Sequence, residues 1–181
     1  MRPVSIQIFD QRKEISVPAV LRTMTIEDIA QWETSWKPLL DASKAQDSTW
    51  DWEDKYRLMS SRNFERFAIE QSGRTEGLMI CETASYSSRK DQQPIVYVES
   101  LAVAPWNRKP EREFCMVGSQ MMLCAVQLSR DVGFKWRVGL HSLPKAEGFY
   151  LKHKMIDFGR SRRTLRYFEF DEKRGRRFAR E

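Results

Sequence analysis

The most constraining feature of the sequence is an apolar strand followed by a loop, a helix and a second strand. Residues 95–103, IVYVESLAV, are rich in β-branched and apolar side chains and predict a central strand that Pro105 stops. A helical pattern of apolar residues follows over 117–132, and Gly133 is placed to end that helix. Another strand is predicted by KWRVGLHSLP, residues 135–144. This order predicts a βαβ crossover within a mixed α/β sheet.

The rest of the chain supplies further strands and helices. In chain order, the predicted elements are a strand at 18–25, helices through 29–40 and at 52–59, a hairpin at 66–85, a polar loop at 87–94, a helix at 145–155 and a closing strand at 165–172. The first helix follows a capping-box pattern, with Thr25 at the N-cap and Asp28 at the third helical position. Ile29, Trp32 and Trp36 then share one apolar face.

The length and composition favour a single domain. A chain of 181 residues with 41% apolar residues can bury one sizeable core and is short for two. We therefore expect a single α/β domain over residues 18–171, in which helices flank a mixed central sheet. Residues 1–17 are predicted to be an N-terminal extension or an edge strand, and residues 172–181 a basic C-terminal tail.

Several classes of protein are disfavoured by the same sequence. The N-terminus lacks an apolar run of signal-peptide length, and no run of about 18 apolar residues could span a bilayer, so we expect a cytoplasmic protein without membrane contact. The cysteines Cys81, Cys115 and Cys124 are odd in number and lack CxxC spacing, and the only histidines are His141 and His153. We predict buried free thiols and no metal site.

Positive charge is concentrated near the C-terminus. The net charge is +6, and residues 160–181 contain nine Lys or Arg against four acids. Such a segment can attract RNA or an acidic partner, because Lys and Arg gain affinity for nucleic acids by releasing condensed counterions. The alternative interpretation is a solvated face or a frayed tail.

The loop between the central strand and the next helix is a candidate phosphate site. A helix that begins there directs its free backbone N–H groups and the positive end of its dipole into the loop. Glycines usually allow phosphate to approach such a backbone closely, and Gly118 is the only glycine in this loop. Spacing alone is therefore weak evidence for phosphate binding.

Residues 95–159 resemble the core of the GNAT superfamily of N-acetyltransferases. The resemblance comprises an acid-bearing strand that ends in LAVAP, a turn into a helix, a strand that ends at LHSLP, and the segment AEGFYLKHKMIDFG. That last segment is similar to the family's A-x-x-F-Y-x-x-x-G-F ending, with Ala146, Phe149 and Tyr150 at matching places and Met155 where the glycine-aromatic pair usually begins. The order of the preceding elements also matches, so the resemblance covers roughly residues 18–171.

The resemblance implies that acetyl-CoA binds at the turn into the helix. The family's turn is [QR]-x-x-G-x-[GA], and here Glu113 stands at the Gln/Arg place, Met116 at the first glycine and Gly118 at the last position. Backbone N–H groups of residues 114–119 would hold the pyrophosphate, with Lys109 as a further phosphate partner. The residues predicted to contact the coenzyme are Leu101, Ala102, Val103, Arg108, Arg112, Met116, Val117, Gly118 and Ser119.

The resemblance also implies roles in acetyl transfer. The N–H of Val103 or of the adjacent Ala102 would polarise the thioester carbonyl. Tyr150 matches the tyrosine that protonates the coenzyme thiolate, although a tyrosine here could equally be part of the core. Glu99 is the first candidate for the base that takes the proton of the amine, or it is a solvated strand residue. His141 is the alternative base, because its ordinary pKa is near neutrality, or it is a hydrogen-bonded residue at a strand end.

The acceptor side is implied to lie in the first two helices, where Trp32, Trp50 and Trp52 are the predicted substrate-binding residues. An aromatic wall suits a cationic or aromatic amine, and the alternative is core packing. The predicted function is acetyl transfer from acetyl-CoA to a small-molecule amine, a protein amine or an aminoacyl-tRNA, by a monomer or homodimer. The alternative is a non-catalytic GNAT-like module that binds a protein or nucleic acid through its basic C-terminal segment.

Overall fold

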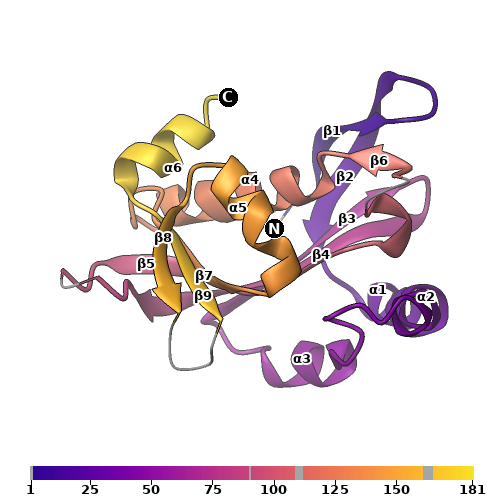
Figure 1. Cartoon of the computed structure of the whole chain (residues 1–181), viewed down its shortest axis with the longest axis horizontal. Coiled ribbons are helices and arrows are strands. Elements are labelled where there is room, and N and C mark those ends of the chain that lie inside the picture. Colours follow the sequence, from indigo (N-terminus) through magenta and orange to yellow (C-terminus); the bar gives the residue numbers. More distant parts are fainter. Residues whose placement is uncertain (1, 90, 109–111, 161–164) are drawn as a thin grey trace. The chain divides into compact units, whose positions relative to one another are not determined.

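A computed structural model of the protein describes residues 2–89, 91–108, 112–160 and 165–181 (Figure 1). The chain divides into two compact units, and each unit contains two segments of the sequence. Unit 1 comprises residues 1–80 and 100–121, and unit 2 comprises residues 81–99 and 122–181.

The elements of unit 1 come mainly from the N-terminal half. They are β1 (Val4–Asp10), β2 (Ile15–Thr23), α1 (Ile26–Gln31), a π-helical turn (Trp32–Trp36), α2 (Lys37–Ala42), α3 (Trp52–Leu58), β3 (Phe64–Gln71), a 3₁₀ turn (Pro105–Asn107) and β6 (Phe114–Cys115). Elements with residues in both units are β4 (Arg74–Tyr86), β5 (Pro94–Val103) and α4 (Val117–Asp131). Unit 2 also contains β7 (Val138–Ser142), a 3₁₀ turn (Pro144–Ala146), α5 (Glu147–Lys152), β8 (Ile156–Arg160), β9 (Arg166–Phe170) and α6 (Glu172–Phe178).

In the described part of the chain, nine strands form one mixed sheet with the order β6-β1-β2-β3-β4-β5-β7-β9-β8. Strands β5 and β7 are parallel, and Val96 pairs with Val138 at the start of their ladder. The pairs β1–β2, β1–β6, β2–β3, β7–β9 and β8–β9 are antiparallel. Helix α4 connects the parallel strands, so the predicted βαβ crossover and the mixed α/β fold are confirmed. No helix of the described residues is both long and apolar enough to cross a membrane.

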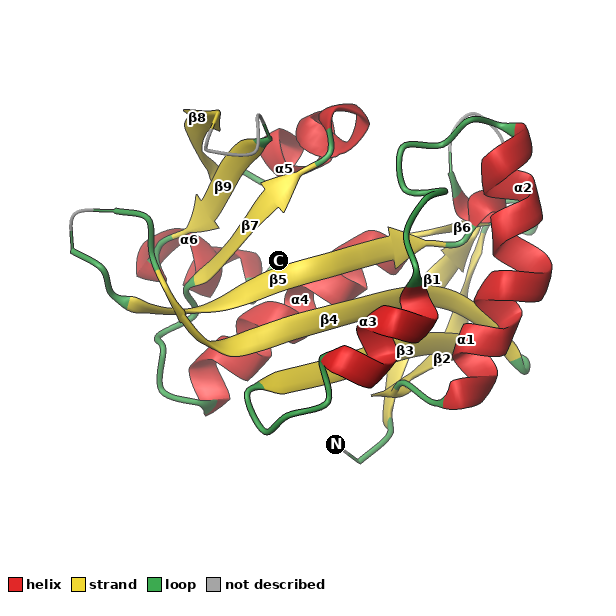
Figure 2. Ribbon diagram, turned by 90° about the horizontal axis from the view of Figure 1, so that it is seen from below, coloured by secondary structure: helices red, strands yellow, loops and turns green. Residues whose placement is uncertain are grey.

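The core of unit 1 is rich in tryptophan. Helices α1, α2 and α3 lie on one face of the strands of this unit (Figure 2). Trp32, Trp36 and Trp52 are completely buried there, and Ala102 and Ala104 from the end of β5 belong to the same cluster. The ring of Trp32 is 5.3 Å from that of Trp36 and 5.6 Å from that of Trp52, measured between centroids. The predicted apolar helix face therefore packs as an aromatic cluster against the sheet.

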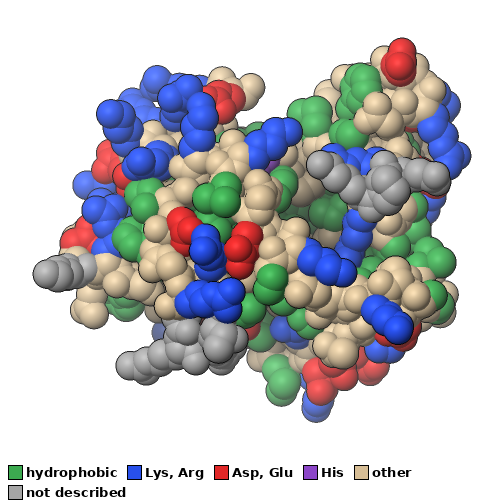
Figure 3. All heavy atoms as spheres, in the orientation of Figure 1, with side chains coloured by type: hydrophobic (Ala, Val, Ile, Leu, Met, Phe, Trp, Pro, Cys, Tyr) green, Lys and Arg blue, Asp and Glu red, His purple; other side chains and the backbone are tan. Residues whose placement is uncertain are grey.

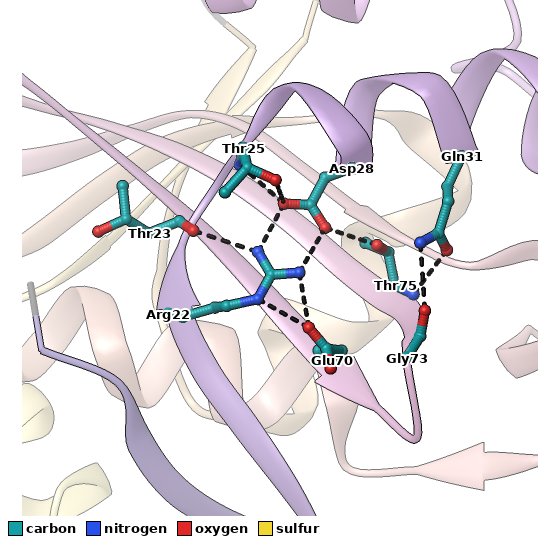
Figure 4. Close-up of polar contacts among 8 residues, drawn as sticks. All are labelled: Arg22, Thr23, Thr25, Asp28, Gln31, Glu70, Gly73 and Thr75. Atoms are coloured by element: carbon teal, nitrogen blue, oxygen red, sulfur yellow. Dashed lines mark hydrogen bonds and ion pairs between the residues drawn. The ribbon is translucent and has the colours of Figure 1, made fainter.

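The start of α1 is fixed by the capping box and by an ion pair beneath it (Figure 4). The backbone N–H of Thr25 donates to the completely buried carboxylate of Asp28 at 2.8 Å, which confirms the predicted pattern. Arg22 donates to both carboxylate oxygens of Asp28, at 2.6 and 2.9 Å, and also to Glu70 at 2.9 Å. The hydroxyl of Thr75 donates to Asp28 at 2.6 Å. This buried carboxylate thus links α1 to strands β2 and β4, and Arg22 extends the network to Glu70 on β3.

The hairpin between β3 and β4 turns at the predicted Ser72–Gly73 pair. Both residues are left-handed, with φ angles of 50° and 80°, which matches the twist that tight hairpins need. The amide of Gln31 spans the turn: its nitrogen donates to the Gly73 carbonyl at 3.3 Å, and its oxygen accepts from the Thr75 N–H at 2.9 Å (Figure 4). Helix α1 therefore also fixes the turn of the hairpin.

Unit 2 contains two elements that the sequence analysis does not predict. Strand β8 follows α5 and pairs antiparallel with β9. Helix α6 occupies residues 172–178, and Asp171 at its N-cap accepts a hydrogen bond from the Arg174 N–H at 2.8 Å. Gly175 is buried in the middle of α6, where a Cβ would collide with the backbone of Trp136. The basic C-terminal segment is thus a helix packed on unit 2.

Candidate functional site

The candidate coenzyme residues of unit 1 follow the end of strand β5. Along this strand, alternate residues are buried or half-buried: Ser100 and Ala102 are buried, whereas Leu101 and Val103 are half-buried. The 3₁₀ turn at Pro105–Asn107 follows directly. The chain then forms β6 and enters α4 at Val117. This is the predicted succession of strand, loop and helix.

A buried carboxylate organises the loop. Glu76 on β4 is completely buried, and its Oε2 atom accepts hydrogen bonds from the Trp106 indole at 2.7 Å and the Asn107 amide at 2.6 Å. Its Oε1 atom accepts from Arg74 at 2.7 Å. The Asn107 Oδ1 atom in turn accepts from the Phe114 N–H at 2.9 Å. Burial raises the pKa of Glu76, and the hydrogen bonds from Trp106 and Arg74 offset only part of that rise.

Glu113 stands where the family motif has Gln or Arg, and its charge is offset within the unit. Arg74 donates to its carboxylate at 2.6 Å, and Arg12 lies 3.8 Å from it. The Arg74 guanidinium also stacks over the Trp106 ring, 4.6 Å from its centroid. This acidic residue therefore forms part of the network that holds the loop.

Met116 has the backbone conformation of a glycine. Its φ angle is 74°, in the left-handed region that glycine favours, and its side chain is half exposed to solvent. Its carbonyl accepts the N–H of Gln120 at 2.8 Å, which begins the hydrogen-bond ladder of α4. The first turn of α4, with Val117, Gly118 and Ser119, carries no acidic residue. The backbone therefore turns at the place of the motif's first glycine, despite the methionine.

The first turn of α4 packs unusually close to strand β4. A Cβ at Gly77 would lie 2.9 Å from Cγ1 of Val117 and 3.0 Å from Cε of Met121. Val117 and Met121 are both buried. Because Gly77 has no Cβ, the first turn of α4 can pack closely against β4, as expected where another element approaches a strand.

The predicted phosphate partners have different surroundings. Arg108 forms a two-pronged ion pair with Asp47, at 2.8 and 2.6 Å, and its Nε atom donates to the Val103 carbonyl at 2.8 Å. This guanidinium therefore fixes the strand end and is engaged by a carboxylate. Arg112 is half-buried next to the network of the loop. The third predicted partner, Lys109, lies outside the described residues.

The predicted acceptor-binding tryptophans are mostly internal. Trp32 and Trp52 are completely buried, and their indole N–H groups, like that of Trp36, have no hydrogen-bond partner among the described residues. Trp50 is half-buried, and the Lys55 ammonium lies 5.4 Å from the centroid of its ring. Among the three predicted residues, Trp50 thus presents the most surface to a ligand.

The candidate catalytic residues Glu99, His141 and Tyr150 belong to unit 2. Tyr150 on α5 is buried, and its ring lies 5.1 Å from that of Phe149 and 5.6 Å from that of Phe168. Burial raises the pKa of the Tyr150 hydroxyl well above its ordinary value. This phenol therefore keeps its proton at neutral pH, as a general acid must.

Both candidate bases lie on the parallel strands. The β5–β7 ladder runs from Val96 paired with Val138 to Val98 paired with Leu140. Glu99 is half-buried and follows directly on β5, and His141 follows on β7, where its Nδ1 atom lies 2.6 Å from the Tyr97 hydroxyl. In an alternating strand, Tyr97 and Glu99 share one face.

The sequence analysis does not identify the residues that position the loop. Asp47, Arg74 and Glu76 are all missed, although Glu76 carries a usable signal: it interrupts the apolar strand just before GLMIC, where a carboxylate needs partners. Asp47 and Arg108 are 61 positions apart, so no local pattern connects them. Within the described residues, no group of three or more His, Cys, Asp or Glu could hold a metal ion.

Comparisons with known proteins identify the fold. No family model matches the sequence, and no curated protein matches it. The GNAT domain of S. lividans PAT is 14% identical with a TM-score of 0.63, covering 93% of this chain and 96% of that one. The aminoglycoside acetyltransferase AAC(6')-Ib, solved with coenzyme A and kanamycin, is 14% identical with a TM-score of 0.62, covering 88% of this chain and 98% of that one. Apo FdhC, a nucleotide-linked sugar GNAT, is 12% identical with a TM-score of 0.62, covering 96% of this chain and 93% of that one.

Proposed function

We propose that this chain, which has the GNAT fold, transfers an acetyl group from acetyl-CoA to a primary amine. The observation that carries the proposal is the conformation of Met116, whose φ angle of 74° occurs at the place of the motif's first glycine. A turn that keeps this backbone shape keeps its N–H groups directed as a phosphate-binding turn requires. The residue type differs from the motif here, and the backbone has a left-handed φ angle of the kind that glycine favours.

The residues of the turn fit the charge of a pyrophosphate. The Phe114 N–H already donates to Asn107, so residues 115–119 would supply the backbone N–H groups. The first turn of α4 contains no acid, and Glu113 is offset by Arg74 at 2.6 Å. Arg112 can add a charged hydrogen bond. Arg108 contributes differently: by binding the Val103 carbonyl, it fixes the strand end whose N–H would polarise the thioester.

The proposed reaction is a direct transfer. The amine nitrogen attacks the thioester carbon, a C–N bond forms and the C–S bond breaks. Glu99 takes the proton of the amine, or His141 does so, and Tyr150 gives its proton to the departing thiolate. The phenol of Tyr150 is protonated at neutral pH and therefore has a proton to donate, but burial raises its pKa and makes that proton harder to release.

The proposal is tested by calorimetric titration with acetyl-CoA, followed by turnover assays on small amines, peptide amines and aminoacyl-tRNA. We expect saturable binding, and we expect Tyr150→Phe to lower kcat by about 100-fold or more while coenzyme affinity changes little. Tyr86→Phe is the matched control, because Tyr86 is an exposed tyrosine of the same unit. Unchanged turnover in Tyr150→Phe would exclude Tyr150 as the acid. An absence of acetyl-CoA binding would favour the non-catalytic binding module.

A further inference from the structure

A second candidate site lies in unit 2, outside the residues assigned to acetyl transfer. An open pocket with a volume of about 490 Å³ lies between the end of α5 and helix α6. Its lining includes four cationic side chains, Lys154, Lys173, Arg174 and Arg177, and two aromatic rings, His153 and Phe178. Figure 3 shows Lys and Arg side chains gathered where Figure 1 places α6.

The pocket is built on a fixed helix. Gly175 is buried and packs directly on the Trp136 backbone, so α6 is held against the unit at its centre. Phe178 stacks on Phe170 with ring centroids 5.1 Å apart, and it also meets the His153 ring at 5.1 Å. The cations around the pocket are therefore carried by packed backbone, which lowers the entropy lost when they bind a ligand.

The positive charge of the pocket is only partly balanced. Arg174 pairs with Asp171 at 2.9 Å and Arg177 with Glu181 at 2.8 Å, and these pairs are largely exposed, so each contributes little. Lys154 and Lys173 are exposed, and within the described residues neither forms an ion pair. Burial lowers the pKa of His153, so its ring is neutral near pH 7 and leaves the charge to the other side chains.

The chemistry of the lining selects one class of ligand. A volume of about 490 Å³ falls in the range of small-ligand sites and exceeds the size of one phosphate ion. Two ammonium groups without an ion pair among the described residues bind phosphate well as point charges, and the two guanidinium groups, whose pairs within the chain are largely exposed, can also bind phosphate. An aromatic ring beside cations favours stacking with a nucleobase.

We propose that this pocket binds a phosphate-bearing ligand of nucleotide size, with Lys154 and Lys173 as its phosphate partners and Phe178 as its aromatic contact. The ligand is either a free nucleotide or one nucleotide of a single strand, since the recognised groups are the same. The lining residues are not among those assigned to acetyl transfer, so the test does not depend on turnover.

The test uses the full chain and two fluorescent probes, mant-ATP and a labelled 12-nucleotide single strand, titrated at several salt concentrations. The test variant is Lys154→Ala/Lys173→Ala. The control, Lys13→Ala/Lys44→Ala, removes the same charge from unit 1, and Lys44 matches Lys154 in being an exposed lysine with a positive φ angle, 49° against 61°. Both pairs are exposed, so circular dichroism should show that both variants remain folded.

We expect the test variant to weaken binding of at least one probe by about tenfold or more, with the control unchanged. For the strand, loss of two phosphate contacts should also reduce the slope of log K against log salt by about 1.4. Binding of mant-ATP alone would identify a free nucleotide, and binding of the strand alone would identify a nucleic acid. Three results would overturn the proposal: no binding of either probe, equal losses in both variants, or mutual exclusion of probe and acetyl-CoA, which would assign the pocket to the coenzyme. Equal displacement by poly-glutamate would overturn the selectivity for phosphate.

Discussion

Replacement of Met116 tests whether the turn into α4 keeps the conformation of a glycine. A left-handed φ angle of 74° places Cβ close to the following carbonyl, at a cost of about 1–2 kcal/mol for a residue other than glycine. Met116→Gly removes this strain. It also makes the unfolded chain more flexible, which lowers the free energy of unfolding by about 0.5–1 kcal/mol. Met116→Ala keeps Cβ and therefore the strain. The glycine variant should be the more stable of the two by roughly 1 kcal/mol.

The assay compares the free energy of unfolding of both variants in urea, with a matched pair elsewhere. Gln127 is an exposed residue in the middle of α4, where alanine should be more stable than glycine by about 1 kcal/mol. The glycine variant is therefore expected to be the more stable of the two at position 116, and the alanine variant at position 127. In a domain of this size, such a difference corresponds to about 2–4 °C in melting temperature.

If alanine is as stable as glycine at position 116, the left-handed turn is not present in solution. The coenzyme gives a second readout, because the Met116 side chain is 50% exposed beside the N–H groups of the turn. We expect acetyl-CoA to bind Met116→Gly more tightly than Met116→Ala, since glycine lets phosphate approach the backbone. Identical affinities would remove the main support for a phosphate-binding turn.

Two further predictions follow from buried groups. Asp28→Ala should lower the free energy of unfolding by about 2–4 kcal/mol, because it leaves the Thr75 hydroxyl without its acceptor and the Arg22 guanidinium with Glu70 as its remaining carboxylate; a loss below 1 kcal/mol in urea would contradict this role. Burial raises the pKa of both Tyr150 and Tyr167 above the ordinary value, so the folded state holds these protons more tightly. The contribution of these two tyrosines to the free energy of unfolding is fully present below about pH 10 and is lost as the pH rises above that value. Melting curves from pH 9 to 11 should show this decline, and Tyr150→Phe should flatten it; an unchanged slope in that variant would contradict the raised pKa.

Local patterns in the sequence predict those elements whose cause is also local. The capping box at Thr25 and Asp28, the turn at Ser72–Gly73 and the end of α4 near Gly133 depend on neighbouring residues, and all three occur in the structure. The crossover was predicted for the same reason, since an apolar strand, a helix of fifteen residues and a second strand have distinct periods.

Helix α6 was missed because its cause is distant in the sequence. The segment EKRGRRF has high charge, a central glycine and no apolar face, which is typical of a solvated tail. Its helix is stabilised instead by contacts with other elements: Gly175 meets Trp136, and Phe178 stacks on Phe170. Such tertiary contacts override weak local propensity.

Strand β8 was missed for a second reason. Its sequence, IDFGR, is short and contains Gly159 at a φ angle of 78°, and the ladder with β9 shifts register between Asp157 and Arg160. A bulge of this kind interrupts the two-residue alternation by which a strand is detected. Strand β8 therefore forms through its antiparallel pairing with β9.

The loop into α4 shows how a glycine-poor sequence can form a left-handed turn at the start of a helix. Glycines allow such turns because they lack the steric restriction of a Cβ. In this chain, contacts with residues outside the loop hold its conformation instead. Buried Glu76 binds Trp106 and Asn107, and Asn107 binds the Phe114 N–H, so both ends of the loop are fixed to one carboxylate. Met116 follows only two residues after Phe114, and the surrounding contacts can hold it in a left-handed conformation that its own preference disfavours. The loop before this left-handed turn is therefore held by a buried carboxylate on β4, a strand that lies outside the motif.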